Sequence, residues 1–326
     1  GKGFDPRVVA RRYEQLADLS ARLEVLSEPL RVTAEGLKAF MRMWDFDLGV
    51  LYQMKNASLD PVLVVGAGPD KAREAARALD PAVSGAFQAL VFEQREPVLV
   101  LDYADWEGAE PAFKDSGLAT VVGVPLRTSG ELFGVLCIGT FGQVADIGPD
   151  TKTVLSAIQL RVERALERIH LLDSLRETRQ EALRVVGLTL EYRDFETKGH
   201  TDRVTQLAGM LGRACGLTPE QLETLTWGSY LHDVGKIAIP DQILLKPGRL
   251  TASEFEYIKS HTLIGEEMLR NLSFLSDAVL QVVRHHHERW DGQGYPDGLA
   301  ADEIPYLARL FAISDVYDAL TSERPY

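Results

Sequence analysis

The side chains best suited to bind metal ions are concentrated in the C-terminal part of this sequence. Six of its seven histidines lie between His200 and His287. His232 directly precedes Asp233, and Glu196 stands four residues before His200. Imidazole and carboxylate groups together suit divalent metals, and a carboxylate can bridge two ions. A buried histidine hydrogen-bonded to its neighbour is the alternative interpretation, and the grouping of the histidines favours a metal site.

The segments that carry these residues have helical patterns. Apolar residues between Leu222 and Leu231 predict a buried helix that ends at His232-Asp233, where two ionisable groups are costly to bury without a partner. Glu196 and His200 share one face if their segment is helical. His261 opens a further helical segment. We therefore expect an all-α bundle with the site at its centre.

Residues 183–326 contain an ordered series of motifs. They are His200 with Arg203, His232-Asp233-x-Gly235-Lys236, His261, His286-His287-Glu288, Asp291-Gly292-x-Gly294-Tyr295-Pro296, Asp315 with Asp318-Ala319-Leu320, and Arg324-Pro325-Tyr326. With these motifs the segment resembles the HD-GYP family, the HD phosphohydrolases that hydrolyse the bacterial second messenger cyclic di-GMP. The family pattern continues past Tyr326, so we expect the domain to be incomplete at this end.

The resemblance implies a role for each matched residue. The implied metal ligands are His200, His232, Asp233 as the bridge, His261, His286, His287 and Asp315, with Glu196 completing a trinuclear rather than a dinuclear centre. The implied catalytic residues are His232, Asp233 and Lys236, and the candidate substrate contacts are Lys236, Arg289, Tyr295 and Arg324. His285 is expected to lie behind the ligands or to face solvent. A site rich in histidine and carboxylate without thiolate favours iron or manganese.

Such a centre predicts hydrolysis of a phosphodiester. Two ions lower the pKa of a bridging water and bind the nonbridging oxygens, and Lys236 or a metal neutralises the departing oxygen. The expected products from cyclic di-GMP are the linear dinucleotide pGpG, GMP, or both. Two alternatives stay open: a cyclic di-GMP receptor that binds without turnover, and an HD phosphohydrolase of another cyclic dinucleotide.

Residues 30–145 alternate helix-like and strand-like patterns. Strands are predicted at 47–54, 61–66, 98–101, 119–127 and 132–139, with a hairpin turn at Thr128-Ser129-Gly130. Thr120 to Leu126, followed by Gly130 and Leu132 to Leu136, resembles a GAF domain, a small α+β sensor module. No histidine precedes His170, which argues against haem, and Cys137 lies within a predicted core strand, which argues against bilin attachment. A cyclic nucleotide, a small metabolite or no ligand remain as alternatives.

Helical patterns flank this module. A helix is predicted from Val9 to Pro29. Apolar residues in 3-4 alternation predict a connecting helix whose seam packs against its copy in a parallel dimer: Leu155, Ile158, Val162, Ala165, Ile169 and Leu172. The expected organisation is an α+β multidomain protein with an N-terminal helix (1–29), a GAF sensor domain (30–145), a connecting coiled-coil helix (146–182) and an all-α HD-GYP domain (183–326). We expect His170, beside the seam, on the surface.

Composition narrows the choice of partners. The net charge of −13 argues against a protein that coats nucleic acid, because polymer phosphates bind basic surfaces. No apolar run approaches the ~18 residues of a membrane span. Cys137 and Cys215 lack metal-binding spacing and are interpreted as reduced core thiols of a cytoplasmic protein. A homodimer through the GAF and connecting helices is expected, and the loop around Tyr295 is a possible docking site for a partner protein.

Overall fold

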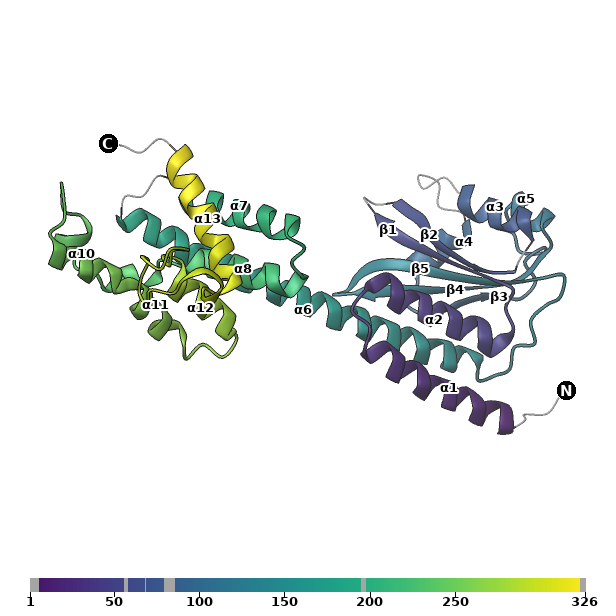
Figure 1. The fold of residues 1–326 in the computed structure, drawn as a ribbon. Helices are drawn as coiled ribbons and strands as arrows, with labels where there is room; N and C mark the ends of the chain where they lie inside the picture. The colour runs from purple at the N-terminus through teal and green to yellow at the C-terminus, as the bar shows by residue number, and fades with distance from the viewer. Residues whose placement is uncertain (1–5, 56–57, 68, 79–85, 195–197, 323–326) are drawn as a thin grey trace. The chain divides into compact units, whose positions relative to one another are not determined.

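The computed structural model describes residues 6–55, 58–67, 69–78, 86–194 and 198–322. The chain forms two compact units, Gly1–Ser174 and Leu175–Tyr326. Helix α6 (Thr151–Asp194) contributes residues to both units (Figure 1). Each unit has its own hydrophobic core.

The first unit is built on a five-stranded antiparallel sheet with the strand order β2-β1-β5-β4-β3. The strands are β1 (Leu48–Lys55), β2 (Ser58–Gly66), β3 (Val98–Val100), β4 (Leu118–Thr128) and β5 (Glu131–Phe141). Ser129 and Gly130, with φ of 50° and 83°, form the turn between β4 and β5. Positive φ at both central positions is what a tight hairpin turn requires, and the predicted hairpin is confirmed.

Helices cover both faces of this sheet (Figure 1). On one face α2 (Pro29–Trp44) and the first part of α6 share a core with the sheet, and α1 (Pro6–Glu24) packs into the same core. The other face packs against α3 (Asp70–Ala78), α4 (Ala86–Glu93) and α5 (Pro111–Asp115). Neighbouring strand residues serve opposite faces, as the pleat requires: Val122 and Val124 lie in the first core and Val121 in the second.

The predicted dimer seam is buried inside this unit. Leu155, Ile158 and Val162 are fully buried, and they belong to the core that α1 and α2 form with the sheet. The prediction that this seam packs against its copy is therefore wrong. Its 3-4 spacing serves packing within one chain, and only Leu172, 47 % exposed, lies outside that core. The predicted N-terminal helix ends earlier than expected, at Glu24, and Pro29 begins α2.

In the second unit the described elements are helices, as predicted, apart from one isolated antiparallel bridge between Asp291 and Ala300. Besides the end of α6, it contains α7 (His200–Ala214), α8 (Pro219–Leu231), η1 (Val234–Ala238), α9 (Asp241–Leu244), α10 (Ala252–Lys259), α11 (His261–Leu269), α12 (Asp277–His285), η2 (Ala301–Glu303) and α13 (Tyr306–Thr321). Thr218 caps α8 by accepting a hydrogen bond from the Gln221 backbone N–H. Val283, Leu231 and Phe311 lie in the buried clusters that hold the bundle together.

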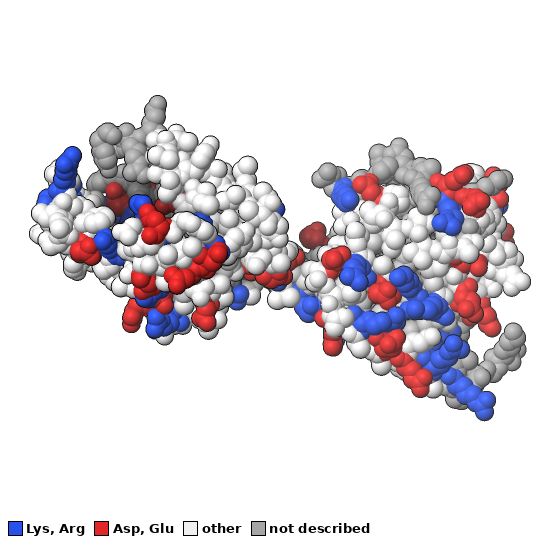
Figure 2. All heavy atoms as spheres, viewed as in Figure 1, with Lys and Arg blue, Asp and Glu red and all other residues white. Residues whose placement is uncertain are grey.

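The two cysteines differ. Cys137 is buried in β5, whereas Cys215 is exposed at the C-terminal end of α7, so the prediction of a core thiol is wrong for Cys215. His170 is exposed, as predicted. Among the described helices, none has the length and apolar content needed to cross a membrane. Figure 2 shows acidic and basic side chains interspersed over the visible face of each unit.

Candidate metal centre

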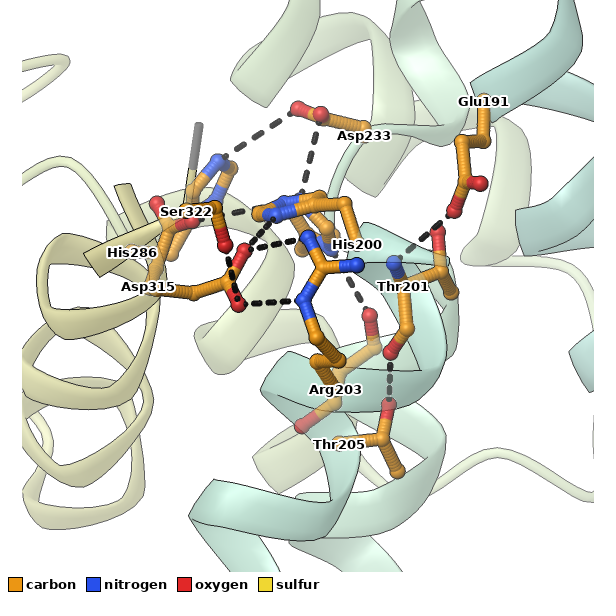
Figure 3. A network of polar contacts seen from close by, with 12 residues as sticks. Glu191, His200, Thr201, Arg203, Thr205, Asp233, His286, Asp315 and Ser322 are labelled. Atoms are coloured by element: carbon orange, nitrogen blue, oxygen red, sulfur yellow. Dashed lines mark hydrogen bonds and ion pairs between the residues drawn. The ribbon is translucent and has the colours of Figure 1, made fainter. Parts of the chain in front are cut away.

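Five helical elements bring the predicted ligands together. His200 begins α7, Asp233 follows α8 and precedes η1, and His261 begins α11. His286 follows α12, and Asp315 lies in α13. Figure 3 shows His200, Asp233, His286 and Asp315 directed toward one region. Four of the histidines are almost fully buried, with exposed fractions between 1 % and 6 %: His200, His232, His261 and His286.

Three of these imidazoles are oriented by the chain just before them. In each ring, Nδ1 lies 2.7–2.8 Å from the carbonyl oxygen three residues earlier. The pairs are His232 with Ser229, His261 with Ile258, and His286 with Val283. A carbonyl oxygen only accepts, so each Nδ1 carries a proton and donates it. In the neutral ring, Nε2 therefore presents a lone pair.

The Nε2 atoms of two of these rings lie close to each other and to Asp233. The Nε2 atoms of His261 and His286 are 3.4 Å apart. Asp233 Oδ1 lies 3.2 Å from the first and 3.8 Å from the second, and it has no hydrogen-bond donor among the described residues. With His287, these groups place one ligand atom each within 4.8 Å of one another. Imidazole nitrogens and a carboxylate oxygen that converge in this way fit a divalent cation, so the donor set suits the implied metal.

The other oxygen of Asp233 faces a second group. Asp233 Oδ2 lies 3.1 Å from His232 Nε2 and 2.6 Å from the ammonium of Lys236. On the same side, His200 Nε2 is 3.5 Å from Asp315 Oδ1. The rings of His200 and His232 are 6.0 Å apart between centroids. The two oxygens of one carboxylate thus face two different sets of candidate ligands.

His200 is oriented by a residue for which sequence reasoning proposed no role. Its Nδ1 donates to Asp318 Oδ2 at 2.8 Å. Arg203 binds both oxygens of Asp318, at 2.7 and 3.0 Å. Burial would raise the pKa of Asp318, but the hydrogen bonds from Arg203 and His200 outweigh it and lower this pKa to about 2. A carboxylate behind a ligating histidine fixes its tautomer and ring orientation. The signal was available, because Arg203 and Asp318 both belong to the recognised motifs.

The pKa shifts at the site differ in direction, because burial and the neighbouring carboxylates act against each other on the histidines. Burial would lower the pKa of His232, but the carboxylates of Asp233 and Asp315 raise it to about 9. Burial would raise the pKa of Asp233, yet His232 and Lys236 hold it well below its usual range. Burial lowers the pKa of His286, which keeps that ring neutral and its Nε2 available.

Gly235 allows η1 to lie against α11. A Cβ at this position would lie 1.9 Å from the carbonyl oxygen of His261, closer than any real contact. Any larger residue would push apart the elements that carry Asp233 and His261. The glycine of the His-Asp motif therefore has a steric role at the site.

The loop after His287 is held by a buried carboxylate. Glu288, 5 % exposed, accepts hydrogen bonds from the backbone N–H groups of Asp297, Gly298 and Leu299. The loop then places the ring of Tyr295 against His287, with 4.7 Å between centroids. His285 is also buried, with Nδ1 3.5 Å from Asp297 Oδ2, so it lies behind the site and does not face solvent.

The predicted substrate contacts differ in burial and in their partners. Lys236 is nearly buried, and its ammonium bridges Asp194 and Asp233. Arg289 is exposed and paired with Asp291. Tyr295 lies beside the candidate ligands. The remaining candidates, Glu196 and Arg324, lie outside the described residues.

Each of the two units of this chain matches a known domain family. A GAF domain model matches residues 26–166, and an HD domain model matches residues 184–326. The chain therefore carries a GAF domain followed by an HD domain, as the two resemblances predicted.

Three curated relatives are named as phosphodiesterases of cyclic dinucleotides. The chain is 43 % identical over 157 residues to the cyclic di-GMP phosphodiesterase response regulator RpfG of Xanthomonas campestris, a match covering 48 % of this chain and 41 % of that protein. It is 45 % identical over 147 residues to a cyclic di-GMP phosphodiesterase of Thermotoga maritima, covering 45 % and 40 %. It is 36 % identical over 193 residues to 3'3'-cGAMP-specific phosphodiesterase 2 of Vibrio cholerae, covering 59 % and 36 %.

These matches span about two fifths of the relatives' own length. Among solved structures, a GAF domain/HD domain protein from Geobacter sulfurreducens is similar over 46 % of this chain and 98 % of that chain, at 15 % identity and a TM-score of 0.36.

Proposed function

We propose that this protein is a metal-dependent phosphodiesterase that hydrolyses cyclic di-GMP to pGpG, GMP or both. The observation that carries the proposal is the meeting of Asp233 Oδ1 with the Nε2 atoms of His261 and His286, whose Nδ1 atoms face backbone carbonyl oxygens. Such an arrangement is costly in a buried site without a cation, and it is well suited to hold one. The curated relatives named above act on cyclic dinucleotides, which supports the substrate class.

The chain supplies two groups of ligands joined by one carboxylate. Asp233 Oδ1, His261, His286 and His287 would hold one ion, and Asp233 Oδ2, His200, His232 and Asp315 a second. Bound divalent ions would supply Lewis acidity and a water of lowered pKa. Lys236 keeps its ammonium beside Asp233, where it can neutralise charge on a departing oxygen.

The identity and number of the ions form part of the proposal. Imidazole and carboxylate ligands without thiolate suit iron or manganese. A third ion would need Glu196, which lies outside the described residues. Metal analysis of protein purified without oxygen tests this point, and about three ions per chain would support a role for Glu196.

The activity is tested by incubating this protein with cyclic di-GMP and separating the products. We expect pGpG or GMP with the wild-type chain and intact substrate with Asp233→Ala, whose folding is checked by circular dichroism. Bound metal with tight cyclic di-GMP binding and no product would support the receptor alternative instead. Because some relatives are named for 3'3'-cGAMP, the panel includes that nucleotide. Faster hydrolysis of 3'3'-cGAMP would reassign the substrate within the same class.

We further propose that the chain is a homodimer and that the GAF domain regulates the phosphodiesterase. Because the predicted seam is buried, the dimer needs another surface. Exposed residues of α6 in the second unit repeat at intervals of 3 and 4: Leu175, Thr178, Ala182, Val185, Thr189 and Tyr192. This spacing fits a parallel second copy of the helix. Leu175, Val185 and Tyr192 are 46 %, 53 % and 74 % exposed and form its apolar positions.

A further inference from the structure

We propose that the last turn of α6 positions the metal centre through Glu191, Arg193 and Asp194. The inference rests on the proposed function, because it assigns positioning residues to the same site. None of the three belongs to the motifs by which the site was recognised. Each contacts one of two segments, the start of α7 or η1, that carry or adjoin the predicted ligands.

Glu191 holds the chain on both sides of His200. One carboxylate oxygen accepts a hydrogen bond from the backbone N–H of Gly199, and the other accepts from Thr201 N–H at 2.9 Å (Figure 3). Gly199 is the N-cap of α7 and provides no side-chain cap. Glu191, 8 % exposed, therefore supplies the cap from another helix, and its charge suits a helix N-terminus. The candidate ligand His200 lies between the two residues whose N–H groups Glu191 binds.

Arg193 and Asp194 hold the segment after Asp233. Arg193 donates to the carbonyl oxygens of Lys236 and Ile239, at 2.6 and 2.8 Å. Asp194, with a side chain only 6 % exposed, accepts from the ammonium of Lys236 at 2.8 Å. The same ammonium lies 2.6 Å from Asp233 Oδ2. The position of η1, and with it the charge beside the bridging carboxylate, depends on this turn of α6.

These contacts set the separation between His200 and Asp233. The two residues lie on different elements, and Glu191 and Asp194 bind those elements from positions less than one helical turn apart. A rotation or shift of this turn would move both segments together.

The experiment compares Glu191→Gln and Asp194→Asn with a matched control, Arg184→Ala. An amide NH₂ cannot accept a hydrogen bond, so Glu191→Gln breaks one of the two bonds beside His200. Arg184 also joins α6 to α7, through a two-point pair with Asp202 at 2.8 Å, but Asp202 is not a candidate ligand. The control therefore removes an interhelical pair of similar kind without touching the site.

The primary measurement is loss of bound manganese to a chelator, in the full chain. We expect Glu191→Gln to weaken metal retention about tenfold, the usual scale for residues that orient ligands, and the control to stay within twofold of wild type. Added manganese should restore the hydrolysis rate of Glu191→Gln, which a general folding defect would not allow. We expect Asp194→Asn to lower kcat while leaving KM within twofold.

Retention by Glu191→Gln equal to that of Arg184→Ala would overturn the positioning role of Glu191. Unchanged kcat in Asp194→Asn would overturn the positioning role of Asp194. If Glu191→Gln does not fold, Asp194→Asn alone tests the proposal. If the wild-type chain hydrolyses no cyclic dinucleotide, the proposed function fails. The chelator comparison still tests the α6 contacts in that case.

Discussion

Asp318 accepts the Nδ1 proton of His200 at 2.8 Å and is itself held by Arg203. This relationship makes Asp318 the residue that keeps His200 Nε2 directed at Asp315. Removing a carboxylate in this position usually lowers metal affinity or activity about 10- to 100-fold.

Asp318→Ala should therefore lower manganese affinity by about tenfold or more. Isothermal titration of the metal-free protein measures this change. Asp302→Ala is the control, since it removes an exposed carboxylate paired with Arg309 away from the site. Equal affinities in the two variants would contradict the role assigned to Asp318.

Gly235→Ala should be strongly destabilising. The added Cβ would meet the His261 carbonyl oxygen at 1.9 Å, so the backbone must move, and overpacking of this kind costs about 1–3 kcal/mol or more. Gly209→Ala is a matched control within α7, because its Cβ would meet nothing closer than 3.6 Å. That change should raise stability by roughly 0.5–1 kcal/mol through helix propensity. Urea unfolding measures both, and a loss of less than 0.5 kcal/mol for Gly235→Ala would count against the steric argument.

The two thiols should differ in reactivity. Burial raises the pKa of Cys137 far above its usual range, and that side chain is enclosed in the sheet. Cys215 is exposed. Iodoacetamide should modify Cys215 in the native protein and leave Cys137 unmodified until denaturant is added, because alkylation requires an accessible thiolate. Peptide mass spectrometry reads both sites, and equal labelling under native conditions would show that β5 is accessible.

The proposed dimer surface predicts a specific cross-link. In a background with Cys137→Ala and Cys215→Ser, Leu175→Cys should form an intermolecular disulfide, because equivalent seam positions face each other in a parallel pair of helices. Ile158→Cys should form none, since Ile158 is fully buried within its own unit. A monomeric mass in solution without a Leu175→Cys cross-link would reject this surface.

Much of the fold followed from local patterns. Strand β1 was predicted at 47–54 and lies at Leu48–Lys55, because a short apolar run that is buried from Leu48 to Tyr52 is typical of a core strand. The seam of α6 shows the limit of such patterns. Its spacing correctly indicated burial along one helix face, but spacing carries no information on whether the partner is another chain or the same one.

Some residues of the site could likewise be predicted from the sequence, and others could not. The candidate ligands were identifiable because the metal-binding residue types stand in recognisable motifs. Asp318 stands in a recognised motif, but its partner His200 is 118 positions away, so the motif alone did not show what Asp318 binds. Glu191 stands outside the motifs, and its contacts with the backbone of Gly199 and Thr201 follow from the fold. Cys215 was misplaced for a related reason, since apolar neighbours on a helix do not reveal which face the thiol occupies.

The carbonyl groups three residues before His232, His261 and His286 have a consequence for how the centre assembles. Each ring is oriented by its own stretch of backbone, so its tautomer is chosen as soon as that stretch forms. Docking of the helices then brings together rings that already present the correct nitrogen. His200 differs, because it depends on α13 for Asp318 and on α6 for the cap beside it. Among the four buried candidate histidine ligands, His200 is therefore the one whose orientation requires contacts from other helices to have formed.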